Sequence, residues 1–239
     1  MHDIDENKRA LLIKALSAGF FAVGGVGLLR PVWAMGKIPT ELVPGKSIYD
    51  MRGSVKVNGT PATLNTLINS KALVQTGANS HLIFAVGKDA FILRDNSSLQ
   101  LSGEGIINEM KLLSGKLLSV FGKREARQSL GIKTVNATIG IRGTGVYLES
   151  EAEKSYICTC YGVAELAAIH DAKSREIVTT QHHDSPRYIF SGESAGNNIR
   201  IATMLNHTDD ELALIETLVG RELPFAAGGG YGVPCKSGY

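Results

Sequence analysis

The stretch "TIGIRGTGVYLES", Thr138 to Ser150, has the composition of a β-strand interrupted by glycine. Its isoleucine, valine and leucine residues favour a strand, but glycine stands at positions 140, 143 and 145, and Arg142 lies in the middle of the apolar run. Glycine inside a strand usually marks a bulge, a bend or a close approach of another backbone. We expect a corner at Gly143, with Arg142 donating to turn carbonyls or a carboxylate. The alternative is that Arg142 contacts a ligand.

Short strands precede and follow this stretch. "GSVKVNGTPA" (53–62) alternates and contains an Asn-Gly turn, which is the strongest short-range signal of a hairpin. The sequence predicts three strands in residues 81–103 and two strands around Ser114-Gly115 in residues 110–122. It predicts one strand each in residues 155–169 and 175–181. No helical pattern separates these strands, so a parallel α/β sheet is disfavoured. The sequence predicts a mainly β fold.

The last part of the chain has a different pattern. "PRYIFSGES" (186–194) predicts the strand that closes the β region. Thr208 and Glu211 then form a capping box, and apolar residues follow at helical spacing until Gly220. One short amphipathic helix is expected here, and the glycine-rich tail after it is expected to form no regular element.

The first residues have the three-part pattern of a signal peptide. A basic opening precedes the uncharged run Ala15 to Leu29, and Val32-Trp33-Ala34 places small residues where signal peptidase cleaves. We expect residues 1–34 to be a signal peptide cleaved after Ala34, which would place the protein in the periplasm without a stable membrane span. A membrane anchor is the alternative, but the run is shorter than the about 20 residues that a spanning helix needs.

The charge balance argues against nucleic acid as a partner. The formal net charge is +2, and no cluster of lysine or arginine is interleaved with aromatic residues. A serine hydrolase is also not expected. Gly192 to Gly196 matches Gly-x-Ser-x-Gly, but the only histidine after Ser194 is His207, and the aspartates follow it, which is the wrong order for a triad on that motif.

Several motifs, taken in order, resemble the FecR domain over residues 48–194. The matching segments are "GSVKVNG", "LVQTGANSHLIF", "DNSSLQL", "LLSGKLLSVFG", "IGIRGTGVYLE", and "YGVAEL" followed by "SGES". Arg142, Gly143 and Thr144 match the Arg-Gly-Thr signature that most identifies the family. The resemblance implies a solenoid-like or sandwich-like β domain at 48–194, in which Arg-Gly-Thr joins two halves, with 195–239 as a C-terminal extension.

The resemblance also implies a function. It indicates a non-catalytic sensory or partner-binding module of the periplasm whose partner is another envelope protein. The best-known members regulate a sigma factor through a cytoplasmic segment before a membrane helix. Here only 14 residues precede the apolar run, so we expect an exported, free-standing FecR-domain protein instead.

One group of residues has chemistry beyond this resemblance. Cys158 and Cys160 would point to the same face of a strand, and His182 and His183 follow the next predicted strand, where His207 could join them. Thiolates with imidazoles suit zinc or copper, so these residues are a candidate metal site or thiol-redox sensor. The cysteines lack the C-x₂₋₄-C spacing of structural zinc sites.

Two simpler interpretations of the cysteines stay open. Cys235 could form a disulfide with Cys158 or Cys160, because an exported chain meets an oxidising compartment. Alternatively, Cys158 and Cys160 are small buried core residues, and the histidines lie in a polar turn.

Overall fold

The structure is a computed structural model that describes residues 40–125, 130–192 and 195–225. The expected signal peptide (1–34), Cys235 and the end of the glycine-rich tail lie outside the described residues. Within the described ranges, no helix is long and apolar enough to cross a membrane.

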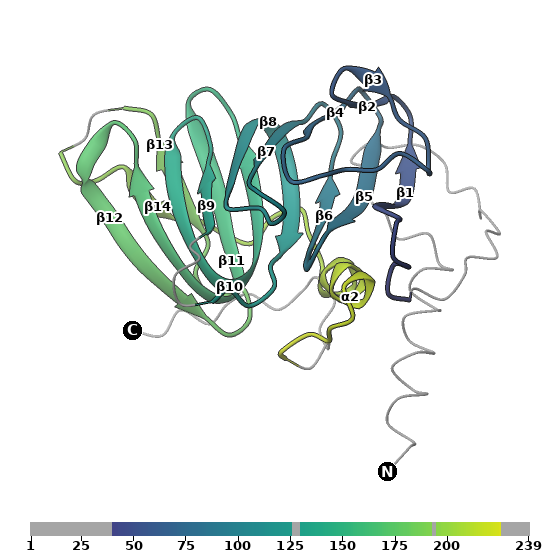
Figure 1. Ribbon diagram of the computed structural model, residues 1–239. Helices are drawn as coiled ribbons and strands as arrows, with labels where there is room; N and C mark the ends of the chain where they lie inside the picture. The colour runs from purple at the N-terminus through teal and green to yellow at the C-terminus, as the bar shows by residue number, and fades with distance from the viewer. Residues whose placement is uncertain (1–39, 126–129, 193–194, 226–239) are drawn as a thin grey trace, which may run out of the picture.

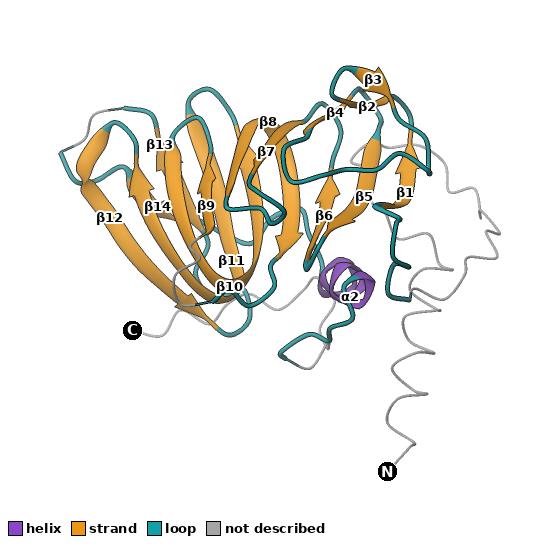
Figure 2. Ribbon diagram, viewed as in Figure 1, coloured by secondary structure: helices purple, strands orange, loops and turns teal. Residues whose placement is uncertain are grey.

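The described chain forms one open sheet of fourteen strands and a single helix near the C-terminus (Figures 1 and 2). The mainly β fold class is therefore confirmed. The elements are β1 (Ile48–Arg52), β2 (Val55–Val57), β3 (Thr60–Pro61), β4 (Leu73–Thr76), β5 (His81–Val86), β6 (Asp89–Leu93), β7 (Ser98–Ser102), β8 (Glu109–Val120), β9 (Leu130–Lys133), β10 (Ala137–Ser150), β11 (Lys154–Ala168), β12 (Asp171–Thr180), β13 (Arg187–Phe190), β14 (Ile199–Ile201) and α2 (Asp209–Leu218).

Most predicted strands are present, with two differences. The hairpin at Asn58-Gly59 forms, and residues 81–103 contain three strands. Residues 110–120, however, belong to one long strand, β8, because Gly115 has a φ of 88° and bends the chain without ending the pairing. The prediction that 186–194 holds the last strand is also wrong, since β14 pairs with β13.

The three longest strands bend, and each does so at a glycine with positive φ. These residues are Gly115 in β8, Gly143 in β10 and Gly162 in β11. The two halves of each strand have different neighbours: β8 pairs first with β7 and then with β6, and β11 pairs first with β13 and then with β12. The sheet therefore folds over itself (Figure 1) and encloses the main hydrophobic core.

The corner at Gly143 is a double bulge between β10 and β11. Arg142 pairs with Val163, but Gly145 pairs with Tyr161 and Val146 with Thr159, so each strand accommodates one extra residue in this interval. The extra residues reverse the alternation of side chains in both strands. As a result Ile139 and Ile141 face the main core before the corner, and Val146 and Leu148 face it after the corner.

The expected role of Arg142 is wrong. Its side chain is exposed and donates no hydrogen bond to any residue that the structure describes. Thr144, by contrast, is fully buried, and its hydroxyl donates to the Val163 carbonyl over 3.4 Å. The corner depends on the backbone freedom of glycine and on Thr144, so the guanidinium is not needed to satisfy the turn.

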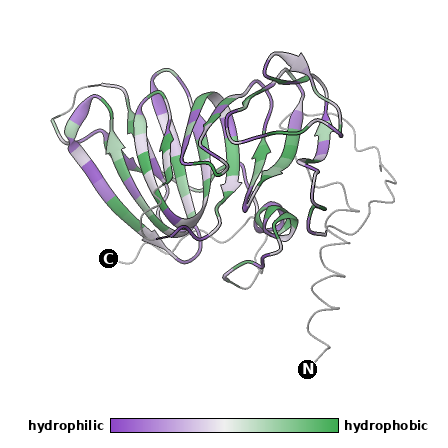
Figure 3. Cartoon of the chain, viewed as in Figure 1, coloured by the Kyte–Doolittle hydropathy of each residue, from purple (hydrophilic) through white to green (hydrophobic). Residues whose placement is uncertain are grey.

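Helix α2 covers the outer face of the sheet and closes a second hydrophobic cluster, which Figure 3 shows as apolar strand surface beside the helix. The predicted capping box is confirmed, because Thr208 accepts from the Glu211 amide and Glu211 accepts from the Thr208 amide. Arg94 of the segment after β6 donates to both oxygens of Glu211 at 2.8 and 2.9 Å. The segment that contains α2 is therefore fixed to the strands by apolar packing and by a partly buried ion pair.

The corner predicts a stability effect. A Cβ added at position 143 would meet no atom within 4 Å, but a β-branched residue is strained at a φ of 58°. Gly143→Val should therefore lower the free energy of unfolding by about 1–3 kcal/mol in urea titration. Gly140→Val, in the same strand without a positive φ, is the matched control and should cost less. Equal losses would contradict the backbone explanation.

Candidate metal centre

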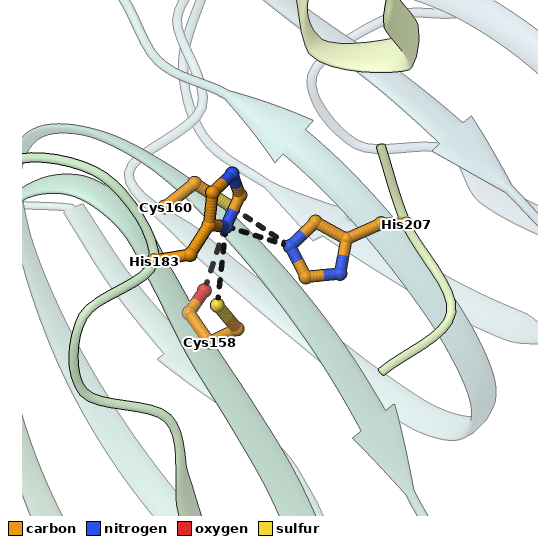
Figure 4. A group of neighbouring side chains, drawn as sticks. All are labelled: Cys158, Cys160, His183 and His207. Atoms are coloured by element: carbon orange, nitrogen blue, oxygen red, sulfur yellow. Dashed lines mark hydrogen bonds between the residues drawn. The ribbon is translucent and has the colours of Figure 1, made fainter. Parts of the chain in front are cut away.

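Four side chains that can bind a transition metal converge beside the segment that leads into α2 (Figure 4). Cys158 and Cys160 lie on β11, before it pairs regularly again at Val163, and point to its outer face. His183 lies in the turn after β12, and His207 lies directly before the N-cap residue of α2. All four are buried, and their ligand atoms lie within 4.8 Å of one another.

The distances between the ligand atoms are short. The Sγ atom of Cys158 lies 3.4 Å from Nδ1 of His183, and the Sγ atom of Cys160 lies 3.4 Å from Nε2 of His207. Nδ1 of His183 and Nε2 of His207 are 3.0 Å apart. A tetrahedral zinc site with ordinary bond lengths would separate two nitrogens by about 3.3 Å and a nitrogen and a sulfur by about 3.6 Å. These three distances are within a few tenths of an ångström of such a site, and the remaining pairs of ligand atoms lie within 4.8 Å.

The outer nitrogen of each imidazole already has a partner. Nδ1 of His207 donates to the Leu205 carbonyl at 2.6 Å, and Nε2 of His183 lies 3.0 Å from Oδ1 of Asp209. Such partners fix the tautomer and direct the other nitrogen, as a lone pair, toward a metal. When both rings are neutral, the two inner nitrogens face one another as acceptors, so a proton or a cation is needed between them.

In the metal-free cluster, the protonation state of each cysteine depends on its neighbours. The hydrogen bond with Cys160 contributes most to a pKa of Cys158 well below its usual value, and His183 and His207 act in the same direction against burial. Burial raises the pKa of Cys160 well above its usual value. Burial also opposes the charging of His183, but Asp209 and Cys158 outweigh it and raise the pKa of His183 to about 9. Without a metal, these pKa shifts favour a Cys158 thiolate beside a His183 imidazolium.

His182 lies outside the group of four. Its Nε2 is 2.9 Å from Oδ2 of Asp209, and its ring packs against Phe225 with the centroids 4.5 Å apart. The carboxylate of Asp209 thus lies between His182 and His183. Together His182, Asp209 and His183 form a second group of possible ligands, which shares His183 with the buried group.

The structure thus brings together three of the four residues suggested by the sequence, and His207 occupies the fourth place. His207 was recognisable only as a histidine that could join the cluster, because its position depends on how α2 packs on the sheet. Cys158 and Cys160 are not bonded to each other. The expected disulfide with Cys235 lies outside the described residues and stays a prediction.

Comparisons with known proteins identify no relative. No family model matches the chain, and no curated protein matches its sequence. Two solved structures of a "putative anti-sigma factor" from Parabacteroides distasonis ATCC 8503, at 1.65 and 2.50 Å resolution, are similar with a TM-score of 0.44 and 11% identity. The similarity covers 55% of this chain and 59% of each of those chains, and at this level it assigns no function.

The thiolate–imidazolium pair predicts how the stability of metal-free protein depends on pH. In the neutral range, folded and unfolded chains bind the same number of protons, because a proton has only moved from Cys158 to His183. Below about pH 6.5 the histidine of the unfolded chain gains a proton. Above about pH 9 the cysteines of the unfolded chain lose their protons, while His183 and Cys160 of the folded protein hold theirs more tightly. The free energy of unfolding should therefore be highest near about pH 7.5 and should fall on both sides.

Urea unfolding after chelator treatment, at acidic, neutral and alkaline pH, measures this profile. His183→Gln cannot form the imidazolium, so it should reduce the fall on the acid side. A wild-type stability that rises steadily from acidic to alkaline pH would contradict the ion pair.

Proposed function

We propose that this chain is a non-catalytic metal-binding module of the cell envelope. In this proposal Cys158, Cys160, His183 and His207 hold one zinc ion. The observation that carries the proposal is the convergence of two sulfurs and two imidazole nitrogens, with the outer nitrogen of each ring already bonded to Asp209 or to the Leu205 carbonyl. Hydrogen bonding of this kind around histidine is typical of metal ligands.

The charge and burial of the site favour zinc over cuprous copper. Two thiolates carry a charge of about −2, which a divalent ion neutralises and a cuprous ion does not, and an unbalanced charge is costly inside a protein. Four protein ligands from a buried site also leave no open coordination position, which is the arrangement of structural zinc sites. Zinc held in this way would fasten β11, the turn after β12 and the start of α2 to one another.

The envelope location and a protein partner are the second part of the proposal. The signal-peptide pattern of residues 1–34 and the ordered FecR-like motifs of residues 48–194 support it. The mainly β fold is compatible with a FecR-type domain, and the bend at Gly143 agrees with a role of Arg-Gly-Thr in joining two halves of the sheet. The proposed partner is another envelope protein.

A thiol-redox sensor is the alternative. The thiolate character of Cys158 favours it, because thiolates are the reactive form of cysteine. Burial of both sulfurs disfavours it, since an oxidant would have to enter the cluster before it could react. A metal ion would protect the same thiolates from oxidation by occupying them.

Metal analysis tests the proposal. The mature protein, purified without a histidine tag and dialysed, should contain about one zinc per chain by mass spectrometry. Cys160→Ser and His207→Ala should each lower zinc affinity strongly, and an excess of zinc should raise the melting temperature of the wild type but not that of these variants.

His170→Ala is a matched control, because His170 is exposed in the turn between β11 and β12. It should retain the full zinc content. Zinc that is absent from the wild type, or that is unaffected by the loss of Cys160 and His207, would contradict the proposal. Reversible oxidation of zinc-free thiols would then favour the redox sensor.

A further inference from the structure

We propose that His182, Asp209 and the outer nitrogen of His183 form a surface capture site that delivers a divalent metal ion to the buried ligands, the ion displacing the proton of that nitrogen to solvent as it binds. This inference rests on the proposed function, because it explains how the ion would reach the group of four. The capture site is adjacent to the buried site and shares one residue with it.

Burial decreases stepwise from the buried site to solvent. The exposed fraction of the side chain is 4% for His183, 12% for Asp209 and 43% for His182. Nε2 of His183 lies 3.0 Å from Oδ1 of Asp209, and Nε2 of His182 lies 2.9 Å from Oδ2 of the same carboxylate. Two imidazoles and a carboxylate therefore meet where the cluster approaches the surface, and both ligand types suit zinc.

His183 connects the two groups through its two nitrogens. Nδ1 faces Cys158 and His207, and Nε2 faces Asp209 and His182. The residue has a φ of 54°, which is uncommon for histidine, and it lies in a short turn where the Gln181 and His182 amides donate to Asp184. The ring of His183 therefore lies between an ion held at the surface and the sulfurs, and its displacement would open the path between the two sites.

The buried ligands give a physical reason for a capture site. Cys158, Cys160 and His207 are fully buried, so a hydrated ion cannot meet them until it has lost water and some protein group has moved. Ligands that replace the lost water one at a time lower the barrier of this step. His182 and Asp209 are placed to do this because they contact the only member of the buried group that also faces outward.

A simpler interpretation is that Asp209 only orients His183 and that His182 only pairs with Asp209. Kinetics separates the two interpretations. A residue that binds the ion only in passing lowers the barrier in both directions, so its loss slows uptake and release equally and leaves the affinity unchanged. A residue that orients a ligand changes the affinity instead, typically by about 10–100-fold.

The experiment measures uptake and release of zinc by the mature chain in a stopped-flow instrument. Metal-free protein is mixed with zinc bound to a weak coloured chelator, and loaded protein is mixed with an excess of a strong chelator. His182→Ala should slow both processes by about tenfold, which corresponds to about 1.4 kcal/mol of barrier, and should change the equilibrium affinity by less than about twofold.

His170→Ala is the control, and it should match the wild type in both rates. His182→Gln keeps a polar side chain but removes the imidazole, so it should behave like His182→Ala. The capture site is contradicted if the His182 variants have unchanged rates, or if they bind zinc more weakly without taking it up more slowly. The wild type would still bind one zinc per chain in that outcome, so the proposed function would stand. A wild type that takes up no zinc would instead overturn the proposed function, and the capture site with it.

Discussion

The double bulge between β10 and β11 determines which side chains reach each face of the sheet. Strand side chains alternate, so one extra residue in each strand moves every later position to the opposite face. Without this reversal, the apolar residues of β10 could not face the main core both before and after the bend. Tyr147, Cys158 and Cys160 point to the outer face of the sheet. His207, which precedes α2, stacks on Tyr147 there, while α2 itself packs on β5, β6 and β8.

The candidate metal site lies where three separate parts of the fold meet. β11 provides the thiols, the turn after β12 provides His183, and the residue before the helix cap provides His207. Apolar packing already fixes α2 to the sheet, since Leu212, Ile215 and Leu218 are buried and each contributes about 1.5–3 kcal/mol. A metal ion would therefore not create this arrangement alone. It would instead order the polar residues at the start of α2, because the apolar residues of the helix are already packed on the sheet.

The sequence predicted the elements that depend on local signals. The Asn58-Gly59 hairpin, the capping box at Thr208 and the helix that ends before Gly220 each follow from residues close together in the chain. The positions that depend on distant packing were less accessible. Gly115 was interpreted as a turn, although a glycine corner can bend a strand that stays paired, and His207 needed the docking of α2 to join the cysteines. Arg142 was expected to satisfy a turn that Gly143 and Thr144 complete without it.

X-ray absorption spectroscopy at the zinc edge tests the central claim most directly, because it reports the atoms bound to the metal. For zinc-loaded protein the account predicts two sulfurs at about 2.3 Å and two nitrogens at about 2.0–2.1 Å. His182→Ala should leave this spectrum unchanged, and His207→Ala should remove one nitrogen. A shell of nitrogen and oxygen alone, with no sulfur, would contradict the account, because it would place the metal away from Cys158 and Cys160.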